Sequence, residues 1–339
     1  VGSTVPVSLT WEKSTTYDLG LDLDFLNNRL SFSGDYYRRY TTDMYTPSIS
    51  LPSVYGTTSP KGNNAELRTT GWELSLTWRD SFKLGGKPFD YSIKAMVWDN
   101  RTVVTKYENA TRSLGTLKGY IQNGGSPSDF YEGMELGEMW GYTVAGLFRD
   151  QADIDSSATH DFTQASDKVT RPGQVKIADL DHNGNIDPGA FTADDHGDLS
   201  IIGNINPHYM FGVNLAANWN GIGLSVFLQG VMKRDWYPSP DSGYFWGKYA
   251  RPFMWVLGIH NYTDDMYSKE KNNWDTAYWP RMTTYQSNSS YSWTKLLEIP
   301  NTRYKQNAAY LRVKNIQVDY TFPKALCQKI RLGGLKIYL

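Results

Sequence analysis

The stretch Tyr17-Asp18-Leu19-Gly20-Leu21-Asp22-Leu23-Asp24-Phe25 decides the fold class. Its odd positions are all leucine or aromatic, and its even positions are aspartate or glycine. Successive side chains of a β-strand point to opposite faces, so this alternation predicts a strand with one apolar and one acidic face. Asn27-Asn28 then predicts a tight hairpin turn into a second alternating strand, which runs from Leu30 to about Tyr45.

Six further strands are predicted along the chain. They are 72–78, 89–97, 209–219, 222–232, 310–322 and a last strand that begins near Leu335. Short turns are predicted at Asn27-Asn28, 84–87, Asn220-Gly221 and Gly333-Gly334, whereas the loops at about 46–65, 104–207 and 233–308 are long. Short and long connections alternate. This is the pattern of an antiparallel up-and-down sheet whose short turns lie at one rim and whose long loops lie at the other.

The apolar faces of these strands could point to lipid or into a soluble sandwich, because both arrangements give the same alternation. The stretches are about ten residues long, which suits a tilted strand that crosses an apolar band of about 25 Å. The apolar faces of the first six strands carry no charged residue, and aromatic residues such as Trp78 and Trp219 lie near strand ends, as at membrane interfaces. The sequence therefore predicts an all-β, antiparallel portion of a transmembrane β-barrel.

The composition excludes several classes of protein. The 34 Lys and Arg residues against 35 Asp and Glu residues leave a formal charge of −1, so no attraction to nucleic acid is expected. The single Cys327 excludes an internal disulfide and a multi-cysteine metal site. The sequence has no apolar run of the roughly 18 residues that a membrane-spanning helix needs. No HExxH, GxSxG or Walker-type motif indicates an enzyme, and the adjacent Asp194-Asp195 lacks the opposed carboxylates of a glycosidase.

Several stretches, spread in order over nearly the whole chain, resemble one family. They are Trp11–Asp22 continuing into Phe25–Leu30, Gly141-Tyr142 with Gly146–Phe148, Gly173–Asp187 followed by Ile202–Asn204 and Pro207, and Tyr310–Asn315 followed by Tyr320–Pro323. Together they resemble the C-terminal half of the SusC/RagA family of TonB-dependent outer-membrane transporters of Bacteroidetes. Each stretch alone is a weak signal, and their common order makes the resemblance specific.

The resemblance implies a plugged 22-stranded barrel in the bacterial outer membrane, with TonB and a SusD-like surface lipoprotein as partners. Eight strands cannot close so wide a barrel. Residues 1–339 are therefore expected to form part of its wall, without the plug, the TonB-contacting region and the final strands. The leading hypothesis is import of oligosaccharides without chemical change. The alternatives are a TonB-dependent importer of peptides and a non-catalytic carbohydrate-binding β protein.

The segment 179–187 has the spacing of a calcium-binding loop, with oxygen-bearing side chains at alternate positions and Gly184 at the sharp turn. The five candidate ligands are Asp179, Asp181, Asn183, Asn185 and Asp187. They predict a structural Ca²⁺ or Mg²⁺ site, because hard cations prefer oxygen ligands. Ala190 stands where a bidentate glutamate would, so Asp187, Asp194 or Asp195 would have to replace that ligand. The alternative is a turn tied by Asx side chains without metal.

The long loop at about 233–308 holds half of the twelve tryptophans. Aromatic rings stack on the apolar faces of sugar rings, and loops on a rigid barrel are where binding surfaces concentrate. The candidates for ligand binding are Trp236, Tyr237, Tyr244, Trp246, Tyr249 and Trp255. Alternatively, these side chains pack into a small core of the loop itself or against a lid partner.

Overall fold

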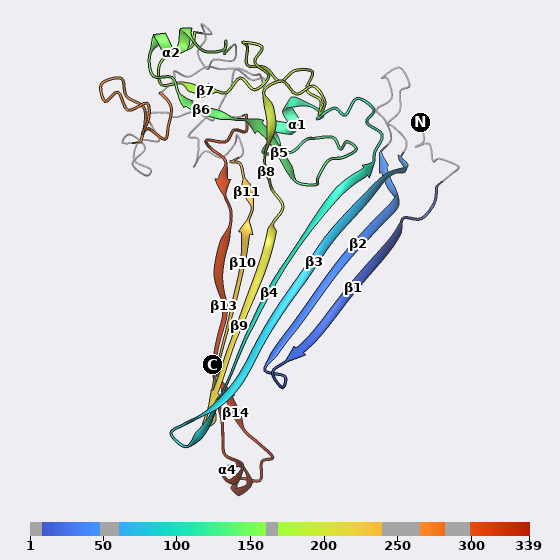
Figure 1. Cartoon of the computed structure of the whole chain (residues 1–339), viewed down its shortest axis with the longest axis vertical. Helices are drawn as coiled ribbons and strands as arrows, with labels where there is room; N and C mark the ends of the chain where they lie inside the picture. Colours follow the sequence, from blue (N-terminus) through green and yellow to red (C-terminus); the bar gives the residue numbers. More distant parts are fainter. Residues whose placement is uncertain (1–8, 48–60, 161–168, 239–264, 282–298) are drawn as a thin grey trace.

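A computed structural model describes residues 9–47, 61–160, 169–238, 265–281 and 299–339. Its main element is an eight-stranded sheet with strand order β1-β2-β3-β4-β9-β10-β13-β14 (Figure 1). The strands are β1 (Lys13–Phe25), β2 (Leu30–Pro47), β3 (Lys61–Leu84), β4 (Lys87–Lys106), β9 (His208–Trp219), β10 (Ile222–Lys233), β13 (Tyr310–Thr321) and β14 (Lys336–Tyr338). Every neighbouring pair is antiparallel, which confirms the predicted up-and-down sheet.

The strand register lines up apolar residues in rows across one face of the sheet. One row runs Leu23, Phe32, Leu76, Ala95, Val213, Leu228 and Val313, and the next runs Phe25, Leu30, Trp78, Ile93, Leu215, Val226 and Ile316. Neither row contains a charged residue, and Leu76 and Val313 are exposed. The soluble sandwich would need these rows packed against a second layer, whereas the buried core of the described residues lies elsewhere. The rows therefore have the character of a lipid-facing wall.

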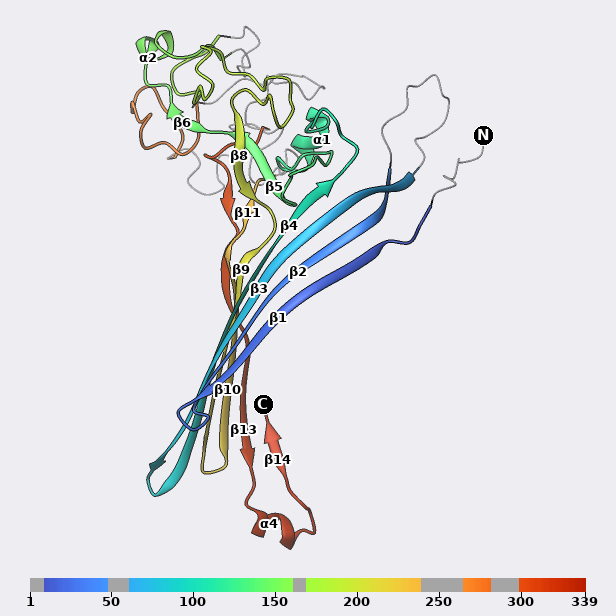
Figure 2. The same ribbon diagram turned by 45° about the vertical axis from the view of Figure 1, so that its right-hand side comes forward.

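The tight turns gather at one end of the sheet and the long connections at the other (Figure 1). Asn220 and Gly221 turn β9 into β10 with φ values of 50° and 86°, the left-handed region that asparagine and glycine tolerate best. The link between β13 and β14 differs from the predicted short turn at Gly333-Gly334. It carries the helix α4 (Lys324–Lys329), and Cys327 of this helix is buried. This link nevertheless lies at the turn end of the sheet (Figure 2).

At the loop end, strands β3 and β4 extend beyond the stretches of alternating apolar and polar residues that predicted them. Strand β3 starts at Lys61, whereas its apolar alternation begins at Trp72. β4 likewise continues to Lys106, beyond the predicted end at Val97. An alternating face is required only where one side of a strand meets lipid, so the pattern fades where the strands rise above the apolar band.

The described parts of the two longest connections fold together into one body, here called the loop body. It is formed by residues 107–160, 169–207, 234–238, 265–281 and 299–309. Its elements are α1 (Leu117–Gln122), β5 (Glu138–Tyr142), β6 (Val144–Leu147), α2 (Gln151–Asp155), β7 (Val175–Ile177), β8 (Leu199–Asn204), β11 (Asp235–Trp236) and β12 (Gln306–Asn307). β5 pairs with β8, β6 with β7, and β11 with β12. No helix among the described residues is long and apolar enough to cross a membrane.

The hydrophobic core of the described residues lies mainly in the loop body. Tyr142 and Leu199 of the first long connection and Ile299 and Tyr304 of the last one have no exposed surface. Chain segments more than a hundred residues apart therefore share one core, and the long loops form a folded platform at one end of the sheet.

Candidate functional site

The predicted cation loop lies between β7 and β8, and its own side chains hold its backbone by hydrogen bonds. Asp179 Oδ2 accepts the Gly184 N–H at 3.0 Å, and Asp181 Oδ1 accepts the Asn183 N–H at 3.0 Å. Asn183 Oδ1 in turn accepts the Asn185 N–H at 2.7 Å. Both the predicted metal loop and its metal-free Asx alternative agree with this backbone.

The structure brings a further carboxylate, Asp198, to this loop. Carboxylate oxygens of Asp179, Asp181 and Asp198 all lie within 4.8 Å of one another. Asp198 is fully buried, and its two oxygens accept the N–H groups of Leu180 at 2.6 Å and Asp187 at 2.9 Å. The sequence analysis missed this residue because it follows the loop by eleven positions, outside the twelve-residue calcium-loop pattern.

The other proposed replacements for the missing glutamate lie differently. Asp194 forms an ion pair with Arg112, and the Asp195 N–H and C=O bond to Thr192. Asp187 lies at the edge of the cluster, where Asn183 Nδ2 is 3.4 Å from its Oδ2. The structure therefore brings Asp198 into the carboxylate cluster, and none of the three predicted replacements, Asp187, Asp194 and Asp195.

Two features of this cluster are compatible with a bound cation. Asp179 Oδ1 is buried and accepts no hydrogen bond from any described residue. Burial raises the pKa of the Asp198 carboxyl, and the nearby negative charges of Asp181 and Asp179 raise it further. The two backbone N–H groups that donate to Asp198 lower this pKa in part. A positive ion between the three carboxylates would supply the missing partner and offset their mutual repulsion.

The six aromatic candidates lie in different surroundings. Tyr244, Trp246, Tyr249 and Trp255 are outside the described residues. Trp236 in β11 is 48% exposed, so its ring is available at the surface of the loop body. Tyr237 is only 3% exposed, and its hydroxyl donates to Ile299 O at 3.1 Å and accepts from Asn301 Nδ2 at 2.8 Å. Tyr237 thus packs in the loop core, as the alternative interpretation expects, while the role of Trp236 stays a prediction.

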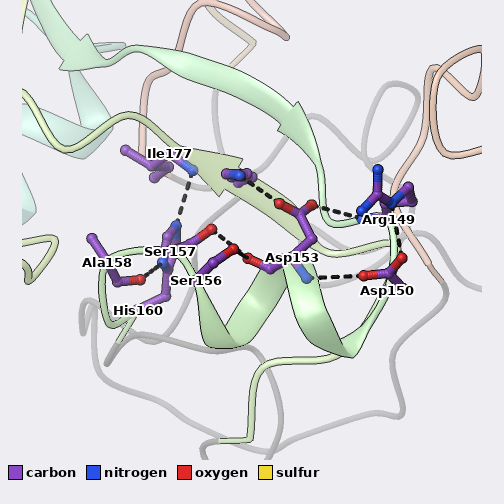
Figure 3. Close-up of polar contacts among 9 residues, drawn as sticks. Arg149, Asp150, Asp153, Ser156, Ser157, Ala158, His160 and Ile177 are labelled. Carbon is purple, nitrogen blue, oxygen red and sulfur yellow. Dashed lines mark hydrogen bonds and ion pairs between the residues drawn. The ribbon is translucent and has the colours of Figure 1, made fainter.

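Helix α2 holds a polar network on the loop body (Figure 3). Asp150 caps the helix by accepting the Asp153 N–H at 2.9 Å, and its other oxygen accepts Arg149 Nε at 2.8 Å. Asp153 accepts the Arg149 N–H at 3.0 Å and Lys176 Nζ at 2.7 Å. The network fixes Arg149 at the start of α2 and ties the helix to β7, since a cap and a partly buried ion pair both order the segment.

His160 is buried beside this network and has both ring nitrogens occupied (Figure 3). Its Nε2 accepts the Ile177 N–H at 2.9 Å, and its Nδ1 lies 2.8 Å from Ala158 O. These partners require the neutral ring with its proton on Nδ1. Burial lowers the pKa of His160 below its usual 6.5, and the positive charge of Lys176 lowers it further. The hydrogen bond to Ala158 O opposes this shift but does not cancel it.

The loop body is therefore expected to lose stability as the pH falls below about 6.5, the pKa of histidine in an unfolded chain. In this range the unfolded chain binds a proton that the folded ring resists, so each pH unit costs up to about 1.4 kcal/mol until the folded-state pKa is reached. The measurement is thermal unfolding of the full-length protein between pH 7.5 and pH 5. Comparison with His160→Gln isolates this residue, and parallel pH curves for the two proteins would contradict the expectation.

Comparison with known proteins gives a consistent set of relatives. Residues 2–172 match the family model described as TonB dependent receptor-like, beta-barrel. TonB-dependent receptor P3 of Formosa agariphila is 25% identical over 338 residues, which cover 98% of this chain and 29% of that protein. TonB-dependent receptor SusC of Bacteroides thetaiotaomicron is 29% identical over 186 residues, which cover 54% of this chain and 16% of that protein.

The solved structures agree on the fold. The structure of the RagAB peptide transporter superposes with a TM-score of 0.63 at 19% identity, covering 97% of this chain and 31% of the matched chain. The RagAB peptide importer in its 'closed-closed' state gives a TM-score of 0.61 at 20% identity. This chain thus spans less than a third of the length of these relatives.

Proposed function

Because this chain belongs to the TonB-dependent receptor-like β-barrel family, we propose that it forms part of the wall and the loop platform of a SusC/RagA-type outer-membrane importer of oligosaccharides. The single observation that carries the proposal is the sheet itself, with uncharged rows on one face and a folded loop body at one end. A wall of this kind separates lipid from a lumen, and long folded loops at its rim offer a surface for cargo.

Transport needs partners beyond these residues. The resemblance to SusC-type importers implies TonB, which energises transport, and a SusD-like lipoprotein that caps the barrel. We propose the same partners here. The cargo crosses unchanged, so no catalytic residue is proposed.

The peptide alternative has a specific source. RagAB, whose fold this chain shares, was solved as a peptide importer. At 20% identity this likeness concerns the fold alone. The oligosaccharide proposal rests on the sequence resemblance to SusC-type importers and on the aromatic residues of the long loop.

The deciding experiment is uptake by a strain that lacks the full-length gene, supplied with labelled oligosaccharides in one arm and labelled peptides in the other. We expect loss of oligosaccharide uptake, restored by the intact gene and not by one carrying a disrupted TonB-contacting region. If only peptide uptake is lost, the cargo is a peptide and the oligosaccharide part of this proposal is wrong. Normal uptake of both would refute it.

We also propose a structural Ca²⁺ or Mg²⁺ ion in the loop body, held by Asp179, Asp181 and Asp198, with Asn183, Asn185 and Asp187 as further oxygen donors. When bound, the ion would neutralise the clustered carboxylates. Asp198 lies directly before β8, so its carboxylate ties loop 179–187 to the start of the strand that pairs with β5. Loss of the ion should therefore loosen the platform rather than the barrel wall.

Asp181→Asn is expected to weaken Ca²⁺ or Mg²⁺ binding by about tenfold, because a hard cation loses one charged ligand. Calorimetric titration of the detergent-purified full-length protein measures the affinity, and thermal unfolding with and without chelator measures the stabilisation. Asp181 is exposed, so its substitution should leave the metal-free fold intact.

Asp198→Asn and Asp195→Asn make a matched pair for the same titration. The first removes a carboxylate inside the cluster, and the second removes an exposed one outside it. We expect weaker binding for Asp198→Asn and unchanged binding for Asp195→Asn. Equal affinities in wild type, Asp181→Asn and Asp198→Asn would eliminate the site.

A further inference from the structure

A large groove opens on the loop body between α2 and the segment 265–281. These two segments lie near one another at the end of the molecule away from the tight turns (Figures 1 and 2). Its volume is about 930 Å³, enough for several sugar units or a short peptide. The groove is separate from the cation loop, because the two share no residue.

Backbone contacts hold the walls of this groove together. The Gly173 N–H donates to Phe148 O at 2.7 Å, and the Arg281 N–H donates to Gly173 O at 2.7 Å. Gly173 has a φ of 81°, and a Cβ there would lie 2.1 Å from the Tyr267 ring, so the backbone packs directly against that ring. Backbone contacts therefore fix the segments that form the groove walls, near residues 149, 172, 267 and 281. The charged side chains of these segments are not needed to hold the walls together.

The charge of the groove is opposite to that of the chain. Among the described residues that line it, Arg149, Arg171, Arg281 and Lys269 stand against two carboxylates, Asp150 and Glu270. Their formal charge is +2, in a chain of net charge −1. Both carboxylates are already engaged within the protein. Asp150 caps α2 and pairs with Arg149, and Glu270 accepts the Ser268 hydroxyl at 2.6 Å.

Concave, partly buried cationic sites attract anions, and guanidinium groups match the planar geometry of carboxylates and the oxygens of sulfate esters. The remaining described lining is mixed: Gln151, Ser268 and Asn272 are polar, Pro172 and Met266 are apolar, and Tyr267 is aromatic. The polar side chains of Gln151, Ser268 and Asn272 can bond sugar hydroxyls while the cations hold an acidic substituent.

We infer that this groove binds anionic oligosaccharides, in which carboxylate or sulfate groups are held by Arg281 and Lys269. The inference rests on the proposed import function and narrows its cargo to acidic glycans. It predicts that affinity depends on the acidic substituents and falls with ionic strength, because partly exposed charges are screened by salt.

The test uses the detergent-purified full-length protein and three probes: an oligogalacturonate, its methyl ester of the same length, and a sulfated galactan oligosaccharide. Calorimetry or ligand-induced fluorescence gives the dissociation constants. We expect the acid to bind at least about tenfold more tightly than its ester, as for a charge-assisted hydrogen bond in a half-buried site. The sulfated probe tells whether sulfate serves as well as carboxylate.

Lys269 and Lys271 provide a matched pair of substitutions. Both side chains are exposed in the same turn, but only Lys269 lines the groove. Lys269→Gln should weaken binding of an acidic probe by about two- to fivefold, as expected for an exposed charge pair, and Lys271→Gln should leave it within about twofold. Arg281→Gln should weaken it by about tenfold, because this residue is half-buried.

Several outcomes overturn the inference and remain distinct from failure of the proposed function. Equal affinity for the acid, its ester and the sulfated probe, or equal affinity in the Lys269→Gln and Lys271→Gln proteins, refutes the acidic-glycan groove while oligosaccharide import still stands. Tight binding of an acidic peptide without glycan binding refutes both. If Lys269→Gln weakens capture of the surface lipoprotein and leaves glycan affinity unchanged, the groove is a partner interface instead.

Discussion

Leu76→Arg is expected to lower the free energy of unfolding by about 2–4 kcal/mol, the cost of an arginine on the lipid face of a barrel near its midplane. Leu76 lies in the middle of β3, with Phe32 of β2 and Ala95 of β4 as its cross-strand neighbours. It is 48% exposed although it is apolar, as expected for a side chain whose natural neighbour is lipid. Denaturant unfolding of the full-length protein in lipid vesicles measures the change.

The control is the same substitution one residue earlier, Ser75→Arg. Ser75 faces the opposite side of the sheet, where Asp35, Glu73 and Lys94 line a hollow of about 370 Å³. An arginine there has room and two carboxylates nearby, so we expect little change in stability. Equal destabilisation by both substitutions would mean that the apolar rows do not face lipid.

The sheet was predictable from sequence because its alternation has a physical cause that acts on every lipid-facing strand. Strand pairs such as β9 and β10 also carry their turn in the sequence, as Asn220-Gly221. The ends of β3 and β4 above the lipid were not predictable, since no single solvent constrains one face there. Helix α4 was not predictable for another reason. It has only six residues and buries only Cys327, so its sequence shows no helical repeat of apolar residues.

The candidate sites were predictable only where their residues are close in sequence. The spacing of oxygen-bearing residues in segment 179–187 was enough to predict a candidate cation loop. Asp198 lies outside that spacing and reaches the loop only in the folded chain, where it accepts two backbone hydrogen bonds from it. Tyr237 was an aromatic residue in a long loop, and only tertiary packing decides that it belongs to the core. The arginine-lined groove combines segments up to 132 positions apart, from Arg149 to Arg281, so no local pattern could have found it.

Leu199→Ala is expected to destabilise the loop body by about 2–5 kcal/mol while leaving the barrel strands unchanged. Leu199 opens β8, has no exposed surface, and belongs to the core that the long connections share. Removing its side chain leaves a cavity in a body whose two-stranded sheets cannot stand alone. Hydrogen exchange read by mass spectrometry should show faster exchange in β5 and β8, and exchange in β3 should be unaltered.

Ile201→Ala in the same strand serves as the control, because Ile201 is 55% exposed and its truncation creates no cavity. We expect it to change exchange in β5 and β8 by no more than about 0.5 kcal/mol. If the loop body is a platform for cargo, Leu199→Ala should also reduce binding of the oligosaccharide probes, since the groove walls depend on the same core. Faster exchange in β3 together with β8 would instead show that platform and wall unfold as one unit, and the loops could then not open or close independently of the barrel.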